Sequence, residues 1–130
     1  MLFRSRAAGQ IVLLDRFVDS SVAYQGAGRE LSEDEIRSLS AWATGGLTAD
    51  LTVLLDLPVA DGLARARGRS AADRLERESL EFHERVRAAY LRFAAAEPDR
   101  YLVLDATRAI DDLAHDVAAS VHSRLGVQTP

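Results

Sequence analysis

The sequence predicts an α/β fold in which a parallel β-sheet carries helices on both faces. Three short apolar segments have the length and composition of buried strands. Stretches with helical periodicity separate them, so the pattern reads strand, two helices, strand, two helices, strand, helix. Such alternation is typical of parallel strands joined by right-handed crossovers. We expect a single domain over residues 1–130, because this length supports one modest core and no segment repeats.

The first expected strand is Ile11–Leu14, four apolar residues that are too few and too β-branched for a helix. Asp15 and Arg16 follow it directly, at the strand end where open α/β sheets bind ligands. A carboxylate there can hold a metal ion or its waters, and a guanidinium can grip a phosphate. By themselves these two residues are better explained as an ordinary ion pair. Nine residues later, Tyr24 and Gln25 add an aromatic ring that can stack on a base and an amide that can read its edge.

Two helices are expected before the second strand. Either Ser20 or Ser21 can cap a short helix that Gly26 breaks. A capping box at residues 32–35 starts the next helix, and the glycine pair 45–46 ends it. The apolar positions of this second helix that should face the core are Ile36, Leu39 and Ala43.

The second half of the chain repeats the alternation. The second strand is expected at Leu51–Leu57, followed by a helix from about Val59 to Gly68. A longer helix should run from near Asp73 to about Ala96, and the third strand should span Tyr101–Leu104. Residues 126–130 are expected to form a loose tail. The longer helix should bury Phe82, Val86, Ala89, Tyr90 and Phe93, and the last helix Ile110, Leu113, Val117, Val121 and Leu125.

The composition excludes several classes of protein. A net charge of −4 argues against general nucleic-acid binding. The chain has no cysteine, which excludes disulfides and thiolate metal sites. It shows neither an apolar run of transmembrane length nor the apolar core of a signal peptide. We therefore expect a cytoplasmic protein with no membrane partner.

One stretch resembles a known family. The sequence DRFVDSSVAYQGAGR, from Asp15 to Arg29, is similar to the DR-[YFH]-x-x-SS-x-AYQG-x-x-R motif of bacterial thymidylate kinases. Three further segments resemble the family in the same order, at 43–58, 65–76 and 82–91, so that the resemblance covers about residues 10–125. It implies a P-loop nucleoside monophosphate kinase-like fold. It also implies ATP-dependent phosphorylation of dTMP to dTDP with Mg²⁺.

The resemblance also assigns roles to individual residues. Arg16 would bind phosphate between the two substrates, and Asp15 would act through Mg²⁺ or by positioning the arginine, with no direct metal ligand assigned. Ser21 and Gln25 would hydrogen-bond the thymine, and Tyr24 would pack beside the deoxyribose. Together with Arg69, which is discussed next, Asp15 and Arg16 form the expected catalytic set.

A lid is expected over residues 65–74. A closing lid excludes water and brings guanidinium charge onto the negative charge that develops in the transition state of phosphoryl transfer. The resemblance points to Arg69 for that contact, supported by Arg65 and Arg74. The alternative is that arginines near a helix C-terminus only complement its dipole, and we prefer that explanation for Arg67.

One feature of the family is not matched. Its P-loop, G-x-x-x-x-G-K-[ST], cradles the ATP phosphates, whereas this sequence contains no lysine. Its base-reading Phe-x-Arg segment is also absent. By the resemblance, the fold is therefore truncated at its N-terminus and the ATP site is incomplete. We expect strand edges and apolar helix faces to be left without partners.

Three interpretations follow, in order of preference. The first is a thymidylate kinase whose N-terminal part was lost to a misplaced start or a frameshift, or is supplied as a separate P-loop fragment. The second is a catalytically inert remnant. The third is a dTMP-binding or interaction module without kinase activity. Family members are usually homodimers, and the apolar helix faces could serve that interface. Selectivity for dTMP over dUMP stays open.

Overall fold

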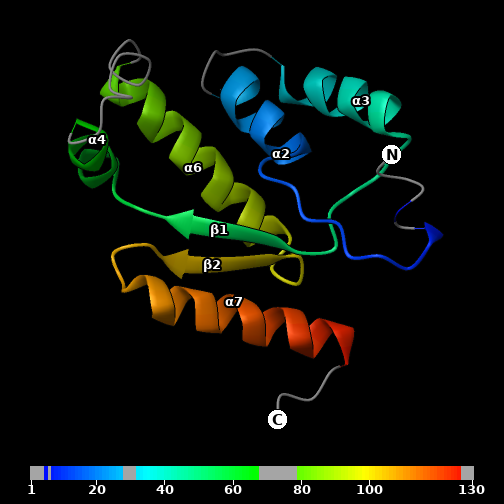
Figure 1. The fold of residues 1–130 in the computed structure, drawn as a ribbon. Helices are drawn as coiled ribbons and strands as arrows, with labels where there is room; N and C mark the ends of the chain where they lie inside the picture. The colour runs from blue at the N-terminus through cyan, green and yellow to red at the C-terminus, as the bar shows by residue number, and fades with distance from the viewer. Residues whose placement is uncertain (1–4, 6, 28–31, 68–78, 127–130) are drawn as a thin grey trace.

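The structure is a computed structural model that describes residues 5, 7–27, 32–67 and 79–126. Its centre is a pair of parallel strands, β1 and β2, in register from Thr52 opposite Tyr101 to Asp56 opposite Asp105. Figure 1 shows α7 on one side of this pair and the other helices on the opposite side. The elements are α2 (Val18–Ser21), the π-helix η1 (Val22–Ala27), α3 (Glu33–Thr44), β1 (Thr52–Asp56), α4 (Val59–Arg67), α6 (Leu80–Ala96), β2 (Tyr101–Asp105) and α7 (Ile110–Leu125).

This arrangement confirms the predicted α/β class. Both later strands lie where the apolar segments predicted them, and they run in the same direction. Helices lie on both sides of the strand pair, as expected from the alternating pattern (Figure 1). In the part of the chain that the structure describes, no helix is long and apolar enough to cross a membrane.

The predicted first strand is wrong. Residues 10–14 have no regular secondary structure, and the side chains of Ile11 and Leu13 are 72% and 94% exposed. A strand is stable only when a neighbouring strand pairs with its backbone. Within the described residues the sheet consists of β1 and β2, and neither pairs with this segment. Asp15 and Arg16 therefore lie in a bend that leads into α2, not at the end of a strand.

The first helix also differs from the prediction. It begins at Val18, after Phe17 as an N-cap that offers no side-chain hydrogen bond, so Ser20 and Ser21 lie inside the helix. It then widens into a π-helix that continues through Gly26. A Cβ at Gly26 would lie 2.8 Å from Cγ of Glu33. The glycine is therefore needed where η1 and the start of α3 come close together, not to break the helix.

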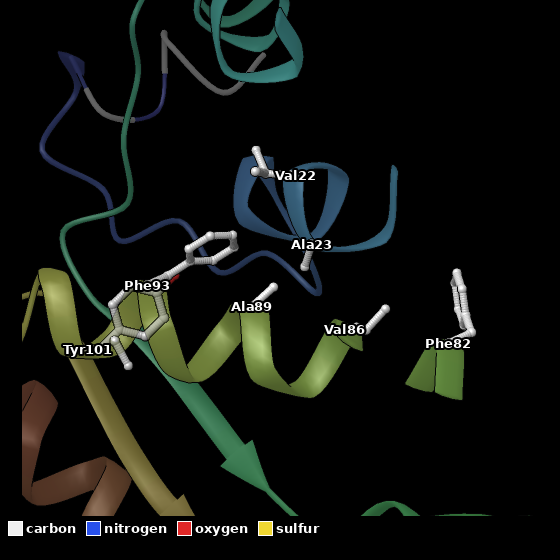
Figure 2. Packing of buried hydrophobic residues seen from close by; sticks show 8 residues of the cluster. Val22, Ala23, Phe82, Val86, Ala89, Phe93 and Tyr101 are labelled. Atoms are coloured by element: carbon white, nitrogen blue, oxygen red, sulfur yellow. The ribbon is translucent and has the colours of Figure 1, made fainter. Parts of the chain in front are cut away.

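The hydrophobic core lies between η1 and α6. Val22 and Ala23 are completely buried, and Figure 2 shows Ala23 pointing toward α6. The predicted inner face of α6 is confirmed, because four of its five positions are buried and Tyr90 packs against them half-buried. The buried cluster comprises Val22, Ala23, Phe82, Val86, Ala89, Phe93, Ala94 and Tyr101.

The start of α6 was predicted too early. Ser79 has an extended backbone, and its Oγ accepts a hydrogen bond of 3.1 Å from the backbone N–H of Phe82. This is the geometry of an N-cap, which fixes the first turn at Leu80 and prevents one continuous helix from Asp73. Residues 68–78 lie outside the described part of the chain.

The ends of α3 were predicted correctly, but its inner face only in part. Oγ of Ser32 accepts a hydrogen bond from the N–H of Glu35, and Gly45 has the left-handed φ of 63° that ends helices. However, Leu39 is 66% exposed and Ala43 is exposed. Ile36, the third predicted inner position, is half-buried and packs against the core cluster, so the prediction is confirmed only at the start of the helix.

The inward face predicted for α7 is wrong at both of its ends. The side chains of Ile110 and Leu125 are 80% and 51% exposed. Leu113, Val117 and Val121, in the middle of the helix, are half-buried. Helical periodicity identifies an apolar face, but only a neighbouring element can cover it. Among the described elements, α7 has its main contact with β2, which is too short to cover the whole face.

Arg100 joins the first helix to the strands. Its guanidinium donates to Asp19 in α2, at 2.7 Å, and to Oγ1 of Thr52 in β1, at 3.0 Å. It also forms a bidentate ion pair with Glu97 at the end of α6. The side chains of Arg100 and Asp19 are only 16% and 15% exposed. Burial raises the pKa of Asp19, but the hydrogen bonds and charge of Arg100 outweigh it and leave the pKa below its ordinary value.

We expect the protein to lose stability as the pH falls below the ordinary aspartate pKa of 3.8. The pKa of Asp19 is lower in the folded chain than in the unfolded chain, so protonation favours unfolding. The stabilising effect is present above the unfolded pKa and is lost as the pH falls through the folded pKa. Urea denaturation between pH 2 and 6 measures it. Asp19→Asn should flatten the acid limb, and an unchanged acid limb in that variant would contradict the assignment.

Candidate functional site

An open pocket lies between the first helical segment and the C-terminal half of α3. Its volume is about 610 Å³. The side chains that line it come from the bend before α2, from α2 and η1, and from the last turns of α3. They are Arg16, Phe17, Val18, Ser20, Ser21, Tyr24, Gln25, Ser40, Ala43 and Thr44. The pocket therefore combines a guanidinium, hydroxyls, an amide and an aromatic ring, which suits a polar ligand with a flat ring.

Arg16 has an unusual backbone. Its φ is 68°, in the left-handed region that non-glycine residues rarely adopt, at a cost of about 1 kcal/mol or more. Its guanidinium lies 4.9 Å from the centre of the Tyr24 ring and donates to the Tyr24 hydroxyl at 3.3 Å. The strained turn thus directs the charge into the pocket. Backbone strain of this kind is concentrated at functional sites.

The π-helix sets the direction of Tyr24 and Gln25. A π-helix places side chains differently from an α-helix, and such segments are frequent at functional sites. Tyr24 packs edge-on against Phe82 of α6, with ring centres 6.0 Å apart, so its position is supported by the core. Gln25 is exposed at the pocket wall, as is Ser21 one turn earlier. The four residues predicted to bind the substrate, Arg16, Ser21, Tyr24 and Gln25, therefore line one pocket.

The other predicted site residues are not part of this pocket. Asp15 is exposed and does not line it. Arg65 lies in α4, where it donates to the backbone carbonyl of Ala106 at 3.1 Å. Arg69 and Arg74 lie outside the described residues. In the described part of the chain, no group of three or more Asp, Glu or His side chains is placed to hold a metal ion.

Two contacts near the strands and the pocket were not foreseen. Ser20, which lines the pocket, shares a hydrogen bond of 2.6 Å with the hydroxyl of Tyr90 in α6. Asp56, at the end of β1, accepts two hydrogen bonds from Arg87, at 2.7 and 2.9 Å, and these hold its pKa below the ordinary value. The partners are 70 and 31 residues apart in the sequence, so spacing alone gives no signal for either pair.

Comparison with known proteins identifies the family. A family model described as thymidylate kinase matches residues 3–117. The chain belongs to the thymidylate kinase family. This confirms the resemblance seen in the sequence and the P-loop nucleoside monophosphate kinase-like fold that it implied.

Several curated thymidylate kinases are close relatives. The chain is 56% identical over 116 residues to that of Deinococcus radiodurans, which covers 89% of this chain and 56% of the relative. It is 53% identical over 120 residues to that of Leifsonia xyli subsp. xyli, covering 90% and 56%. For Clavibacter michiganensis subsp. michiganensis the identity is 57% over 117 residues, covering 89% and 54%. The chain thus spans about half the length of the thymidylate kinases that it matches.

Proposed function

We propose that this chain forms the dTMP-binding part of a thymidylate kinase, an enzyme that transfers a phosphoryl group from ATP to dTMP and gives dTDP. One observation carries the proposal for this chain. The four residues assigned to the substrate by the family motif are gathered around one open pocket.

The chemistry of the pocket fits a nucleoside monophosphate. The guanidinium of Arg16 can grip phosphate oxygens with two donors. Ser21 and Gln25 supply hydroxyl and amide groups that can both donate to and accept from a pyrimidine base. Tyr24 offers a ring wall beside the sugar, where a 2′-hydroxyl would be crowded. Each of these groups acts by binding and orienting the acceptor, which is most of what phosphoryl transfer requires from an enzyme.

The residues present do not fit the triphosphate of ATP. The sequence has no lysine, so it contains no G-x-x-x-x-G-K-[ST] phosphate-binding loop. We therefore propose that the phosphate-binding loop comes from polypeptide outside these 130 residues, either as part of a longer chain or as a separate fragment. For Mg²⁺, Asp15 offers one carboxylate, on the residue that precedes Arg16. This ion is commonly held by one or two carboxylates together with substrate phosphates.

The remaining parts of the proposal concern the lid, the assembly and the location. Arg65, Arg69 and Arg74 would close over the substrates, with Arg69 on the phosphoryl group. The exposed apolar faces of α3 and α7 are suited to contacts with a second copy or with the missing P-loop segment. A cytoplasmic enzyme is proposed, because nucleotide synthesis draws on cytoplasmic ATP.

Titration of the full chain with dTMP, and separately with ATP–Mg²⁺, tests this proposal. We expect weak binding of dTMP, no binding of ATP, and no dTDP. Thymidine is the matched control, since it lacks only the phosphate that Arg16 would hold, and it should bind more weakly than dTMP. Binding of ATP with formation of dTDP would show that the P-loop is dispensable here. Binding of neither nucleotide would favour the inert remnant.

A further inference from the structure

Tyr90 contacts a residue of the pocket wall from the side of the hydrophobic core. It belongs to α6, on the core side of α2, and does not line the pocket itself. Its hydroxyl oxygen lies 2.6 Å from Oγ of Ser20, which does line it. The position of this lining hydroxyl is thus set by a residue of the long core helix.

The packing of Tyr90 fixes the position of its hydroxyl. The ring lies edge-on to Phe93, with centres 6.2 Å apart, and packs against the buried cluster. Its helix is anchored by five buried side chains, those of Phe82, Val86, Ala89, Phe93 and Ala94. A tyrosine held in this way cannot move its hydroxyl far, so the hydroxyl of Ser20 is also held in one direction.

The hydrogen-bonding capacity of the pair leaves Ser20 with one free function. A serine hydroxyl has one donor and two acceptor positions. Burial raises the pKa of the Tyr90 phenol, so it keeps its proton and can serve as the donor. When Tyr90 donates, the proton of Ser20 is available to a ligand in the pocket. Hydrogen bonds in such a chain polarise one another, which strengthens Ser20 as a donor.

The charges nearby indicate which ligand atom would accept that proton. Arg16 and Ser20 line the same pocket. Arg16 in turn lies over Tyr24, within reach of the same part of the pocket. An anionic oxygen held by Arg16 would therefore lie near the Ser20 hydroxyl.

We propose that Tyr90 is a positioning residue that directs the Ser20 hydroxyl onto a phosphate oxygen of the bound nucleoside monophosphate. This inference rests on the proposed function and adds two residues to it, neither of which the substrate set predicted from the sequence includes. Ser20 would touch the ligand, and Tyr90 would act only through Ser20.

The test compares dTMP affinity in four forms of the full chain: unaltered, Ser20→Ala, Tyr90→Phe and the double variant. Each single change should weaken dTMP binding about tenfold, the lower end of what one hydrogen bond to a charged group contributes. The double variant should bind no more weakly than either single variant, because both changes remove the same interaction. Tyr101→Phe is the matched control. It removes a buried phenol oxygen from β2 and should leave the affinity unchanged.

Thymidine separates a positioning role from a merely structural one. Because it has no phosphate, its affinity should be the same in all four forms, whereas a distorted pocket would weaken both ligands. Equal losses for thymidine and dTMP, additive effects of the two changes, or unchanged dTMP binding would overturn the inference while the proposed function stands. Failure of the unaltered chain to bind dTMP would overturn both. Ser20→Ala alone carries the test if Tyr90→Phe lowers the yield of folded protein.

Discussion

Replacing Arg100 with methionine is expected to destabilise the protein by about 3 kcal/mol at pH 7. Methionine keeps most of the side-chain volume but removes every donor, which leaves the carboxylate of Asp19 buried without its main partner. The bond to Thr52 and the pair with Glu97 are lost as well. Chemical denaturation followed by circular dichroism measures the change in the free energy of unfolding.

Two controls make this result specific. Arg108→Met removes an exposed pair with Asp116, whose side chains are 40% and 36% exposed, and should cost less than about 1 kcal/mol. The double variant Asp19→Asn/Arg100→Met should recover part of the loss, since it removes the unpaired charge. In Arg100→Met the loss of stability toward acid pH should be smaller than in the unaltered chain, because protonation then neutralises the unpaired carboxylate of Asp19. Equal effects of the two arginine substitutions would contradict the structural role of Arg100.

Replacing Arg16 with alanine is expected to weaken dTMP binding about 10- to 100-fold. The loss corresponds to about 1.5–3 kcal/mol for hydrogen bonds between charged groups. The fold should be unaffected, because Arg16 is exposed and its guanidinium contacts Tyr24 at the pocket and not the buried cluster of the core. Calorimetric titration with dTMP, alongside thermal unfolding of both proteins, measures the two effects separately.

The variant Arg16→Lys should have a dTMP affinity between those of the unaltered chain and Arg16→Ala. Arg16→Lys keeps the positive charge but loses the planar pair of donors, so it should recover only part of the affinity. Thymidine should bind equally to all three proteins. If Arg16→Ala lost no more affinity for dTMP than for thymidine, the guanidinium would not be a phosphate ligand.

Much of the fold could be predicted from local patterns. The strands around Thr52–Asp56 and Tyr101–Asp105 are continuous apolar runs, and the core face of α6 follows from its helical spacing. The boundaries of α3 were read from its capping residues. These signals are local because they depend on hydrogen bonds and periodicities that span only a few residues.

The pocket residues could be predicted for a related reason. Arg16, Ser21, Tyr24 and Gln25 lie within one short stretch of sequence, so the family motif contains all four. The residue pairs that support the pocket do not lie within one stretch of sequence. Ser20 with Tyr90 and Asp19 with Arg100 are separated by 70 and 81 residues, and each pairing depends on how α2 packs against the rest of the fold.

The sequence by itself determined the helices, the two later strands and the motif that identifies the family. Only the tertiary structure decided which apolar faces are covered. Ile11–Leu14 has the composition of a strand, but the side chains of Ile11, Leu13 and Leu14 are exposed. Ile110 has the position of a core residue but is 80% exposed. The physical reason is that composition and periodicity express what a segment can pair with or bury. Strand formation and burial also require a second element that offers its backbone or its apolar surface.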